Sequence, residues 1–199
     1  MIALGAVVVA ADYELGIDEM EFTVPAFKRE RVNIAGRKLV EAIDADWESW
    51  DDFDWDEYYD SLDVINNWRS AHAYPLLVMR TTLGRYARKV DPDALIAQRI
   101  KRLVSTGAKL KREPKMKLSQ MQDIGGCRAV VSSIDHLRRL KELYEKSDIK
   151  HTRASFDDYI DRPRKSGYRG YHLVYRYRSD KAPKAVYNDL KIEMQLRSQ

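Results

Sequence analysis

The segment Leu190-Lys-Ile-Glu-Met-Gln-Leu-Arg197 alternates apolar and polar side chains along its whole length. A period of two sends the two sets to opposite faces of a β-sheet, so the segment predicts a strand with one apolar and one polar face. The simplest interpretation of the polar face is the solvent side of an antiparallel sheet. The alternative is a functional surface formed by Lys191, Glu193, Gln195 and Arg197.

Periodicity in the preceding segments indicates further strands and helices. We predict strands at residues 94–101, 125–131, 149–156 and 168–178, a final strand at 186–197, and a short helix at 105–111. Ser132 or Ser133 is expected to cap a helix that carries Ile134, Leu137, Leu140 and Tyr144 on one face. The fold class that follows is α+β, with a mixed sheet of about five strands and helices packed on one face.

Residues 1–93 are predicted to form an N-terminal helical region, and residues 94–199 the domain that contains the sheet. Asn33 is the expected N-cap of a first helix, and Pro75 the expected start of a third. The apolar faces are formed by Ala35, Leu39, Ile43 and Trp47 in the first helix, by Tyr58, Leu62, Ile65 and Trp68 in the second, and by Leu76, Met79, Leu83, Tyr86 and Val90 in the third. The apolar residues 2–11 are far fewer than the roughly 20 that span a bilayer, so we expect no membrane association.

Charge is distributed unevenly along the 199 residues. Residues 1–60 contain 5 basic and 16 acidic side chains, while residues 61–199 contain 30 and 15, which gives net charges of −11 and +15. The basic part favours a polyphosphate or nucleic-acid ligand, although a solvated surface explains the counts more simply. The single cysteine, Cys127, excludes an intrachain disulfide, and the four histidines show no zinc spacing, so we expect a cytoplasmic protein.

A basic stretch could bind phosphates. Arg99 and Lys101 lie two residues apart, Lys109 follows, and residues 99–117 contain eight cations against the single anion Glu113. Convergent cations suit a triphosphate, because Arg donates two parallel hydrogen bonds and Lys supplies a mobile point charge. A basic surface helix is the alternative.

An acidic residue and a mixed loop complete the candidate chemistry. Asp123 precedes the pair Gly125-Gly126 and is either a turn residue or a Mg²⁺ ligand, in which case Glu193 is the obvious second carboxylate. Residues 157–172 interleave basic and aromatic side chains around two glycines. That mixture suits a base stacked on a ring with its phosphates held by cations, or simply a mobile basic loop.

Four segments together resemble the synthetase domain of the RelA/SpoT family, the alarmone synthetases. They are Arg99-Ile-Lys101 with Ser105 and Lys109, Gln122-Asp-Ile-Gly-Gly-Cys-Arg128, Asp158-Tyr-Ile160 followed by Gly167-Tyr-Arg-Gly-Tyr-His172, and Glu193-Met-Gln-Leu-Arg197. The resemblance covers residues 94–199, and the segments occur in the family's order and spacing. Each segment is weak evidence alone, but four in register are strong evidence.

The resemblance implies transfer of the β,γ-pyrophosphoryl group of ATP to a ribose 3′-hydroxyl, with release of AMP. It implies that Asp123 and Glu193 are the catalytic residues and hold Mg²⁺, and that Glu193 helps to deprotonate the hydroxyl. The implied ATP-binding residues are Arg99, Lys101, Ser105, Lys109 and Arg128, of which Arg99 and Arg128 sandwich the adenine. The implied acceptor-binding residues are Tyr168, which stacks on a base, with Lys165, Arg169, His172, Gln195 and Arg197.

The sequence does not identify the acceptor. Arg164, Ser166 and Gly170 stand where the family commonly has Lys, Asn and Ser. Residues 64–75 resemble the entry helix of small alarmone synthetases, including the toxic branch found in toxin–antitoxin and phage-defence systems. In that branch the acceptor is the 3′-CCA end of tRNA. We favour tRNA here, with GDP or GTP as the alternative and a non-catalytic nucleotide sensor as a reading of another class.

Two features are interpreted through the same resemblance. With no hydrolase domain before residue 94 and an end at Gln199, where the family continues into a helix, the chain reads as a synthesis-only form or as a fragment. Residues 41–60 contain ten carboxylates, six aromatic rings and no cation. They read most simply as an exposed helix pair, and alternatively as an autoinhibitor of the basic site or a docking site for a protein antitoxin.

Overall fold

The computed structural model describes residues 21–45 and 53–199, so the predictions for residues 2–11 and for Trp47 lie outside the described residues. The helices are α1 (Arg29–Asp44), α2 (Trp55–Ala71), α3 (Ala73–Val90), α4 (Leu103–Arg112), the 3-10 helix η3 (Leu118–Gln120), α5 (Ile134–Glu145) and α6 (Ala182–Ala185). The strands are β1 (Leu95–Ile100), β2 (Gly125–Val131), β3 (Thr152–Asp158), β4 (Tyr171–Arg176) and β5 (Lys191–Ser198).

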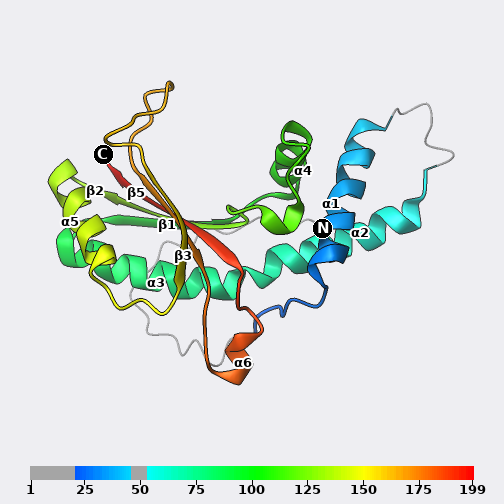
Figure 1. Cartoon of the computed structure of the whole chain (residues 1–199), viewed down its shortest axis with the longest axis horizontal. Helices are drawn as coiled ribbons and strands as arrows, with labels where there is room; N and C mark the ends of the chain where they lie inside the picture. The colour runs from blue at the N-terminus through cyan, green and yellow to red at the C-terminus, as the bar shows by residue number, and fades with distance from the viewer. Residues whose placement is uncertain (1–20, 46–52) are drawn as a thin grey trace.

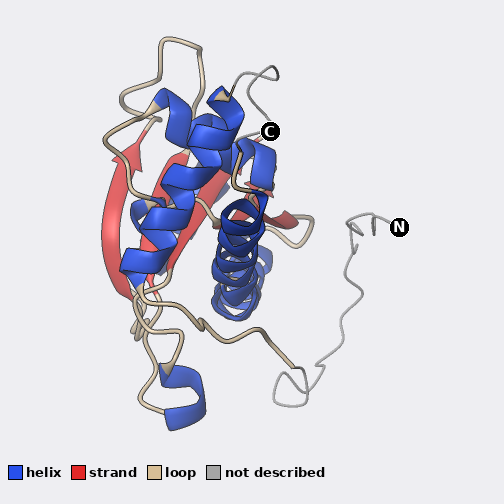
Figure 2. Ribbon diagram, turned by 90° about the vertical axis from the view of Figure 1, so that its right-hand side faces the viewer, coloured by secondary structure: helices blue, strands red, loops and turns tan. Residues whose placement is uncertain are grey.

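The strands form a single curved sheet in the order β1-β2-β5-β4-β3, seen from two directions in Figures 1 and 2. The central pair β2 and β5 is parallel, and the other three pairs are antiparallel. A parallel pair needs a long crossover, which here contains α5, β3, β4 and α6. The predicted α+β fold with a mixed five-stranded sheet is therefore confirmed.

The core lies between this sheet and the helices α3 and α5, which pack on the same face. Along β5, the side chains of Ile192, Met194 and Leu196 are at most 2% exposed, as the alternating pattern predicts. Leu137 and Leu140 of α5 are fully buried against the sheet. The polar side chains of the same strand consequently lie on the other face, which these helices leave open.

The N-terminal helices hold α4 in place. Helix α1 packs against α2, α4 and η3, and its Gly36 lies so close to Leu118 that an added Cβ would be 2.8 Å from the Leu118 Cβ. Helices α2 and α3 are separated only by His72 and run almost end to end across Figure 1. The predicted division between residues 93 and 94 stays a prediction.

Several sequence-based boundaries are wrong. Asn33 does not cap α1, which begins at Arg29; its side chain instead accepts a hydrogen bond from the Ser119 amide at 3.0 Å. Strand β4 begins later than predicted, because Gly167 and Gly170 have φ angles of 78° and 151°, which interrupt an extended chain. Strand β5 also begins later, since α6 and a left-handed Asp189 at φ 69° precede it.

Other expectations agree closely with the structure. Ser133 caps α5, because its side chain accepts a hydrogen bond from the His136 amide, and α4 is one or two residues longer at each end than predicted. Among the described residues, no helix combines the length and the apolar character needed to cross a membrane.

Candidate active site

Two carboxylates from distant parts of the chain lie on the open side of the sheet. Asp123 stands two residues before β2, and Glu193 lies on β5 directly opposite Gly126 in the parallel ladder. The negative charge of Asp123 acts to raise the pKa of Glu193, so the two groups are close enough to interact electrostatically. Gly126 leaves space between the strands here, since an added Cβ would lie 3.9 Å from the Glu193 Oε2.

Asp123 is held by two lysines. The Lys101 Nζ lies 2.8 Å from Oδ2, the Lys109 Nζ lies 3.0 Å from Oδ1, and the side chains of Asp123 and Lys101 are only 15% and 9% exposed. Burial alone would raise the pKa of Asp123, but the two ammonium groups outweigh it and hold the pKa below its usual value. Lys101, at the end of β1, and Lys109, on α4, therefore converge on one carboxylate.

Glu193 is held in a different way, by a histidine and an amide. Its Oε1 lies 3.4 Å from the His172 Nδ1, and its Oε2 accepts a hydrogen bond of 3.0 Å from the Gln195 Nε2. Burial would raise the pKa of Glu193, yet these two contacts outweigh burial and lower it. A carboxylate with a lowered pKa is ionised at neutral pH, which suits metal ligation and the acceptance of a hydrogen bond from a hydroxyl.

Tyr168 joins this group from the loop before β4. Its hydroxyl lies 2.7 Å from the His172 Nε2, and the Arg197 guanidinium lies over its ring at 4.8 Å from the centroid. Burial raises the pKa of Tyr168, so the hydroxyl stays protonated and can donate to His172. His172 therefore holds the hydroxyl of Tyr168 and Arg197 covers one face of its ring, which fixes the ring beside Glu193.

The two carboxylates fit a hard divalent cation. Oxygen ligands suit Mg²⁺, which usually takes one or two carboxylates and completes its shell with water and substrate phosphates. Within residues 21–45 and 53–199 there is no group of three or more His, Cys, Asp or Glu side chains placed to hold a metal. Two carboxylates are a number that Mg²⁺ commonly takes from a protein. The ionised carboxylate of Asp123 also has lone pairs beyond those that the lysines occupy.

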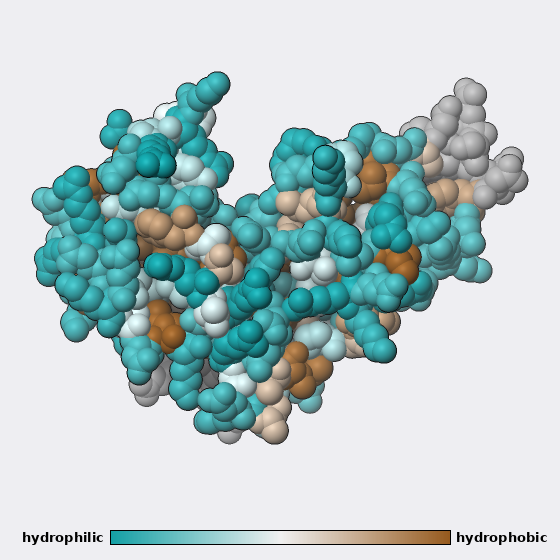
Figure 3. Space-filling model, in the orientation of Figure 1, coloured by the Kyte–Doolittle hydropathy of each residue, from teal (hydrophilic) through white to brown (hydrophobic). Residues whose placement is uncertain are grey.

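Other predicted residues lie on the same elements without joining these contacts. Arg99 is exposed on β1 and pairs in register with Gly126, which places it in the row of Glu193. Ser105 is exposed on α4, and Lys165 and Arg169 are exposed in the loop between β3 and β4. Figure 3 shows the surface indented between that loop and α4.

Residues 98–199, just over half of the chain, match the family model described as a region found in RelA / SpoT proteins. The chain belongs to the RelA/SpoT family. This match contains every residue that the sequence assigned to the site.

Similar proteins were found by sequence and by structure. GTP pyrophosphokinase YjbM of Bacillus subtilis (strain 168) is 34% identical over 99 residues, which cover 48% of this chain and 46% of that protein. The chain therefore matches about half the length of this relative. Small alarmone synthetase 1 from Bacillus subtilis has a TM-score of 0.59 at 23% identity, over 68% of this chain and 72% of that chain. Its complex with the product pppGpp gives 0.53 at 24%, over 62% and 66%, and both likenesses show the fold.

The sequence analysis assigned no role to two further residues of the RelA/SpoT region. Tyr159 meets the rings of Tyr168 and His172 edge-on, with centroid distances of 5.9 and 5.1 Å. Arg164 donates a 2.6 Å hydrogen bond to the Tyr159 hydroxyl and lies over its ring at 4.2 Å. In the sequence, Arg164 stands out only as a departure from the family pattern, and its separation from Tyr159 does not reveal their contact. The contact forms because the loop folds back at Gly167.

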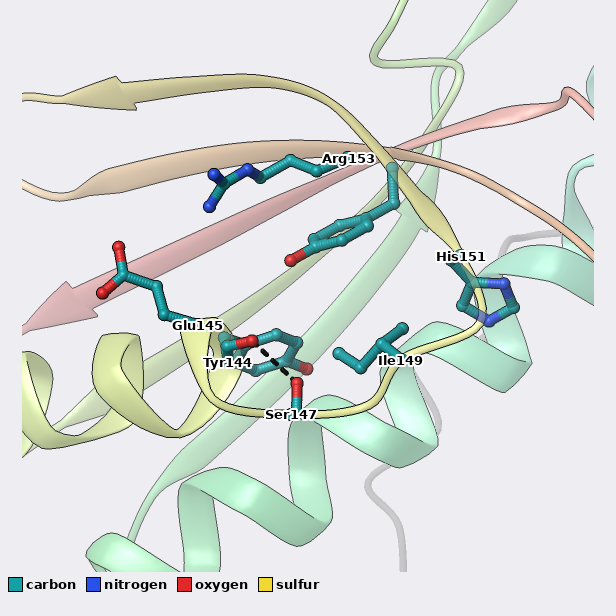
Figure 4. Close-up of a pocket in the computed structure, with 7 residues that line it drawn as sticks. Tyr144, Glu145, Ser147, Ile149, His151 and Arg153 are labelled. Carbon is teal, nitrogen blue, oxygen red and sulfur yellow. Dashed lines mark hydrogen bonds between the residues drawn. The ribbon is translucent and has the colours of Figure 1, made fainter.

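A cavity of about 420 Å³ lies elsewhere, where the end of α5 meets the start of β3 (Figure 4). Its lining is Tyr144, Glu145, Ser147, Ile149, His151, Arg153 and Tyr175. Tyr175 pairs with the core residue Ile192, so the cavity is on the helix-covered side of the sheet. It contains none of the predicted site residues.

Proposed function

We propose that the chain is an ATP-dependent pyrophosphokinase that transfers the β,γ-pyrophosphoryl group of ATP to the ribose 3′-hydroxyl of a guanosine nucleotide. The observation that carries this proposal is the pair of ionised carboxylates, Asp123 and Glu193, on the open side of one sheet. Membership of the RelA/SpoT family and the 34% identity to a GTP pyrophosphokinase support the reaction class and the acceptor.

In this proposal the residues divide the reaction between donor and acceptor. Arg99 and Arg128 stack on the adenine, while Lys101, Ser105 and Lys109 bind the phosphates. Tyr168 stacks on the acceptor base, with Lys165, Arg169, His172 and Arg197 around the acceptor and the transferring group. Phosphoryl transfer needs mainly positioning and neutralisation of charge, which convergent cations provide.

The bond changes are those of an in-line displacement. The acceptor 3′-oxygen bonds to the β-phosphorus, the bond from that phosphorus to the α–β bridging oxygen breaks, and AMP leaves. Glu193 accepts a hydrogen bond from the attacking hydroxyl and takes its proton as the bond forms. Asp123 and Glu193 would hold Mg²⁺, which supplies neutralising charge at the phosphates.

A tRNA acceptor, which the sequence analysis favoured, is the second candidate. The observation in its favour is the net charge of +15 over residues 61–199, together with exposed Arg162, Lys165 and Arg169 beside Tyr168. The relative with a named acceptor is a GTP pyrophosphokinase, so we place the guanosine nucleotide first. No observation in the described residues favours an antitoxin. In the acidic segment 41–60, Glu41 and Glu57 form ion pairs with Lys38 of α1, within the helical region.

The test supplies ATP labelled in its γ-phosphate together with GDP, GTP or total tRNA. We expect label on the guanosine nucleotide and equimolar AMP, and a loss of about 10²–10⁴ in rate for Glu193→Ala. Label on tRNA, with a rate that falls steeply as salt rises, would show that tRNA is the acceptor of the same pyrophosphoryl transfer. Bound ATP without AMP release in the wild type would overturn the proposal in favour of a sensor.

A further inference from the structure

Three polar side chains lie side by side across the open face of the sheet. Arg128 on β2 is in register with Gln195 on β5, and Gln195 is in register with His172 on β4. The Arg128 Nε donates a 3.1 Å hydrogen bond to the Gln195 Oε1, and the Gln195 Nε2 donates a 3.0 Å hydrogen bond to the Glu193 Oε2. One amide therefore connects a predicted ATP-binding residue with a predicted catalytic carboxylate.

The chemistry of its neighbours fixes the orientation of this amide. A guanidinium can only donate hydrogen bonds, and an ionised carboxylate can only accept them. Turning the amide over would place its NH₂ against the Arg128 N–H and its oxygen against the Glu193 carboxylate. Both contacts would then be repulsive, so the amide has a single favourable orientation.

We propose that Gln195 is a positioning residue that holds the Arg128 guanidinium and the Glu193 carboxylate in one fixed relation, and does not bind the acceptor directly. The inference rests on the proposed function and revises one residue of it. A hydrogen bond through Nε lies in the plane of the guanidinium, so it leaves both faces free to stack. The second hydrogen bond orients Glu193 from the side opposite His172, whose Nδ1 contacts the other carboxylate oxygen.

The geometry separates two effects that substitutions can resolve. Gln195→Met has a similar length and loses both hydrogen bonds. Gln195→Glu keeps an oxygen for Arg128, but it replaces the N–H that Glu193 accepts from with a negative charge that repels Glu193. The first variant removes a contact of Arg128 and a contact of Glu193, whereas the second keeps the contact of Arg128 and disturbs Glu193.

The experiment measures kcat and KM for ATP with the purified protein, labelled ATP and a saturating acceptor, and KM for GDP or GTP at saturating ATP. For Gln195→Met we expect KM for ATP to rise about 3-fold to 10-fold, the size of one hydrogen bond, and kcat to fall at least 10-fold. For Gln195→Glu we expect kcat to fall by at least as much while KM for ATP stays within 2-fold of the wild type. A merely structural role would not split the two constants in this way.

Two further measurements keep the outcome decisive. Gln98→Met makes the same chemical change at an exposed position on β1, opposite Cys127 in the ladder, and should leave both constants unchanged. Thermal melts establish that each variant is folded. In an active wild type, an unchanged kcat in Gln195→Glu, or a rise in the KM for GDP or GTP alone in Gln195→Met, would overturn the inference. An inactive wild type would instead count against the proposed function.

Discussion

Asp123 and Glu193 are both ionised, but their partners differ in charge. Asp123 is neutralised by the ammonium groups of Lys101 and Lys109, whereas Glu193 is held by Gln195 and His172. Removing the charge of Asp123 leaves Lys101, which is 8% exposed, without its counter-ion. A desolvated charge without a partner costs far more free energy than a neutral donor without one.

We therefore predict stability effects of different size for two isosteric substitutions. Asp123→Asn should lower the free energy of unfolding by about 1–3 kcal/mol, because Lys101 loses its ion pair. Glu193→Gln should change it by no more than about 0.5 kcal/mol, although both variants should lose activity. Urea unfolding at pH 7 measures both values. An Asp123→Asn variant as stable as the wild type would show that the lysines do not depend on Asp123.

The sequence nominates the residues of the candidate site, but it could not predict which of them contact one another. The motifs identified Lys101, Lys109 and Asp123, and predicted that the lysines bind phosphates and that the carboxylate binds a metal ion. Their mutual contacts depend on how the end of β1 and α4 meet the turn before β2, across separations of 22 and 14 residues. A pattern in one sequence contains no information on such distances. The same limit applies to the contact of Gln195 with Arg128, 67 residues apart.

At the scale of elements, α4 and the turn that contains Asp123 are supported by helix α1. Gly36 of α1 faces the side chain of Leu118 of η3, and Gly107 of α4 faces the side chain of Ile43 of α1. The two glycines differ in what an added methyl group would meet. At Gly36 it would lie 2.8 Å from the rigid Leu118 Cβ, and at Gly107 it would meet the terminal Cδ1 of the 44% exposed Ile43.

This difference predicts different results for the same substitution. Alanine in a helix interior gains about 1 kcal/mol over glycine at either position. In Gly36→Ala the contact with Leu118 should outweigh this gain and lower the free energy of unfolding by about 1–2 kcal/mol. In Gly107→Ala, Ile43 can rotate away, so stability should be unchanged or slightly higher. Denaturant unfolding of both variants tests the packing, and a Gly36→Ala variant as stable as Gly107→Ala would contradict it.

The same elements show why fold class was predictable and boundaries were not. Alternation in β5 and the 3.6-residue period in α5 each record burial on one face, so element types follow from the sequence. Helix starts depend on single contacts: Asn33 is a good capping residue, but its side chain bonds Ser119, 86 residues away. Strand β4 begins only after Gly170, because the positive φ angle of this glycine interrupts the extended chain, and hydropathy does not reveal that angle.

For the whole molecule, the junction of α2 and α3 connects the helical region to the sheet. His72 forms this junction, is 1% exposed, and lies against β2, where an added Cβ on Gly125 would be 3.4 Å from the His72 Cβ. Its Nδ1 is 2.7 Å from the Trp68 carbonyl oxygen, so the neutral ring donates that hydrogen bond. Burial lowers the pKa of His72 to about 4, despite the opposing effect of this bond. The folded protein consequently keeps His72 neutral over most of the acidic range.

This pKa makes the stability of the whole protein depend on pH. The unfolded chain binds a proton at His72 near its ordinary pKa of 6.5, and the folded chain only near 4, so protonation favours unfolding between these values. The free energy of unfolding should therefore fall by up to about 3 kcal/mol from pH 7 to pH 4 through this residue alone. His72→Asn offers a neutral N–H to the same carbonyl and should remove that part of the slope, whatever its stability at pH 7. Urea unfolding of both proteins at pH 7, 5.5 and 4.5 tests this prediction. If the two free energies of unfolding fall in parallel as the pH is lowered, His72 is protonated in the folded state as readily as in the unfolded chain.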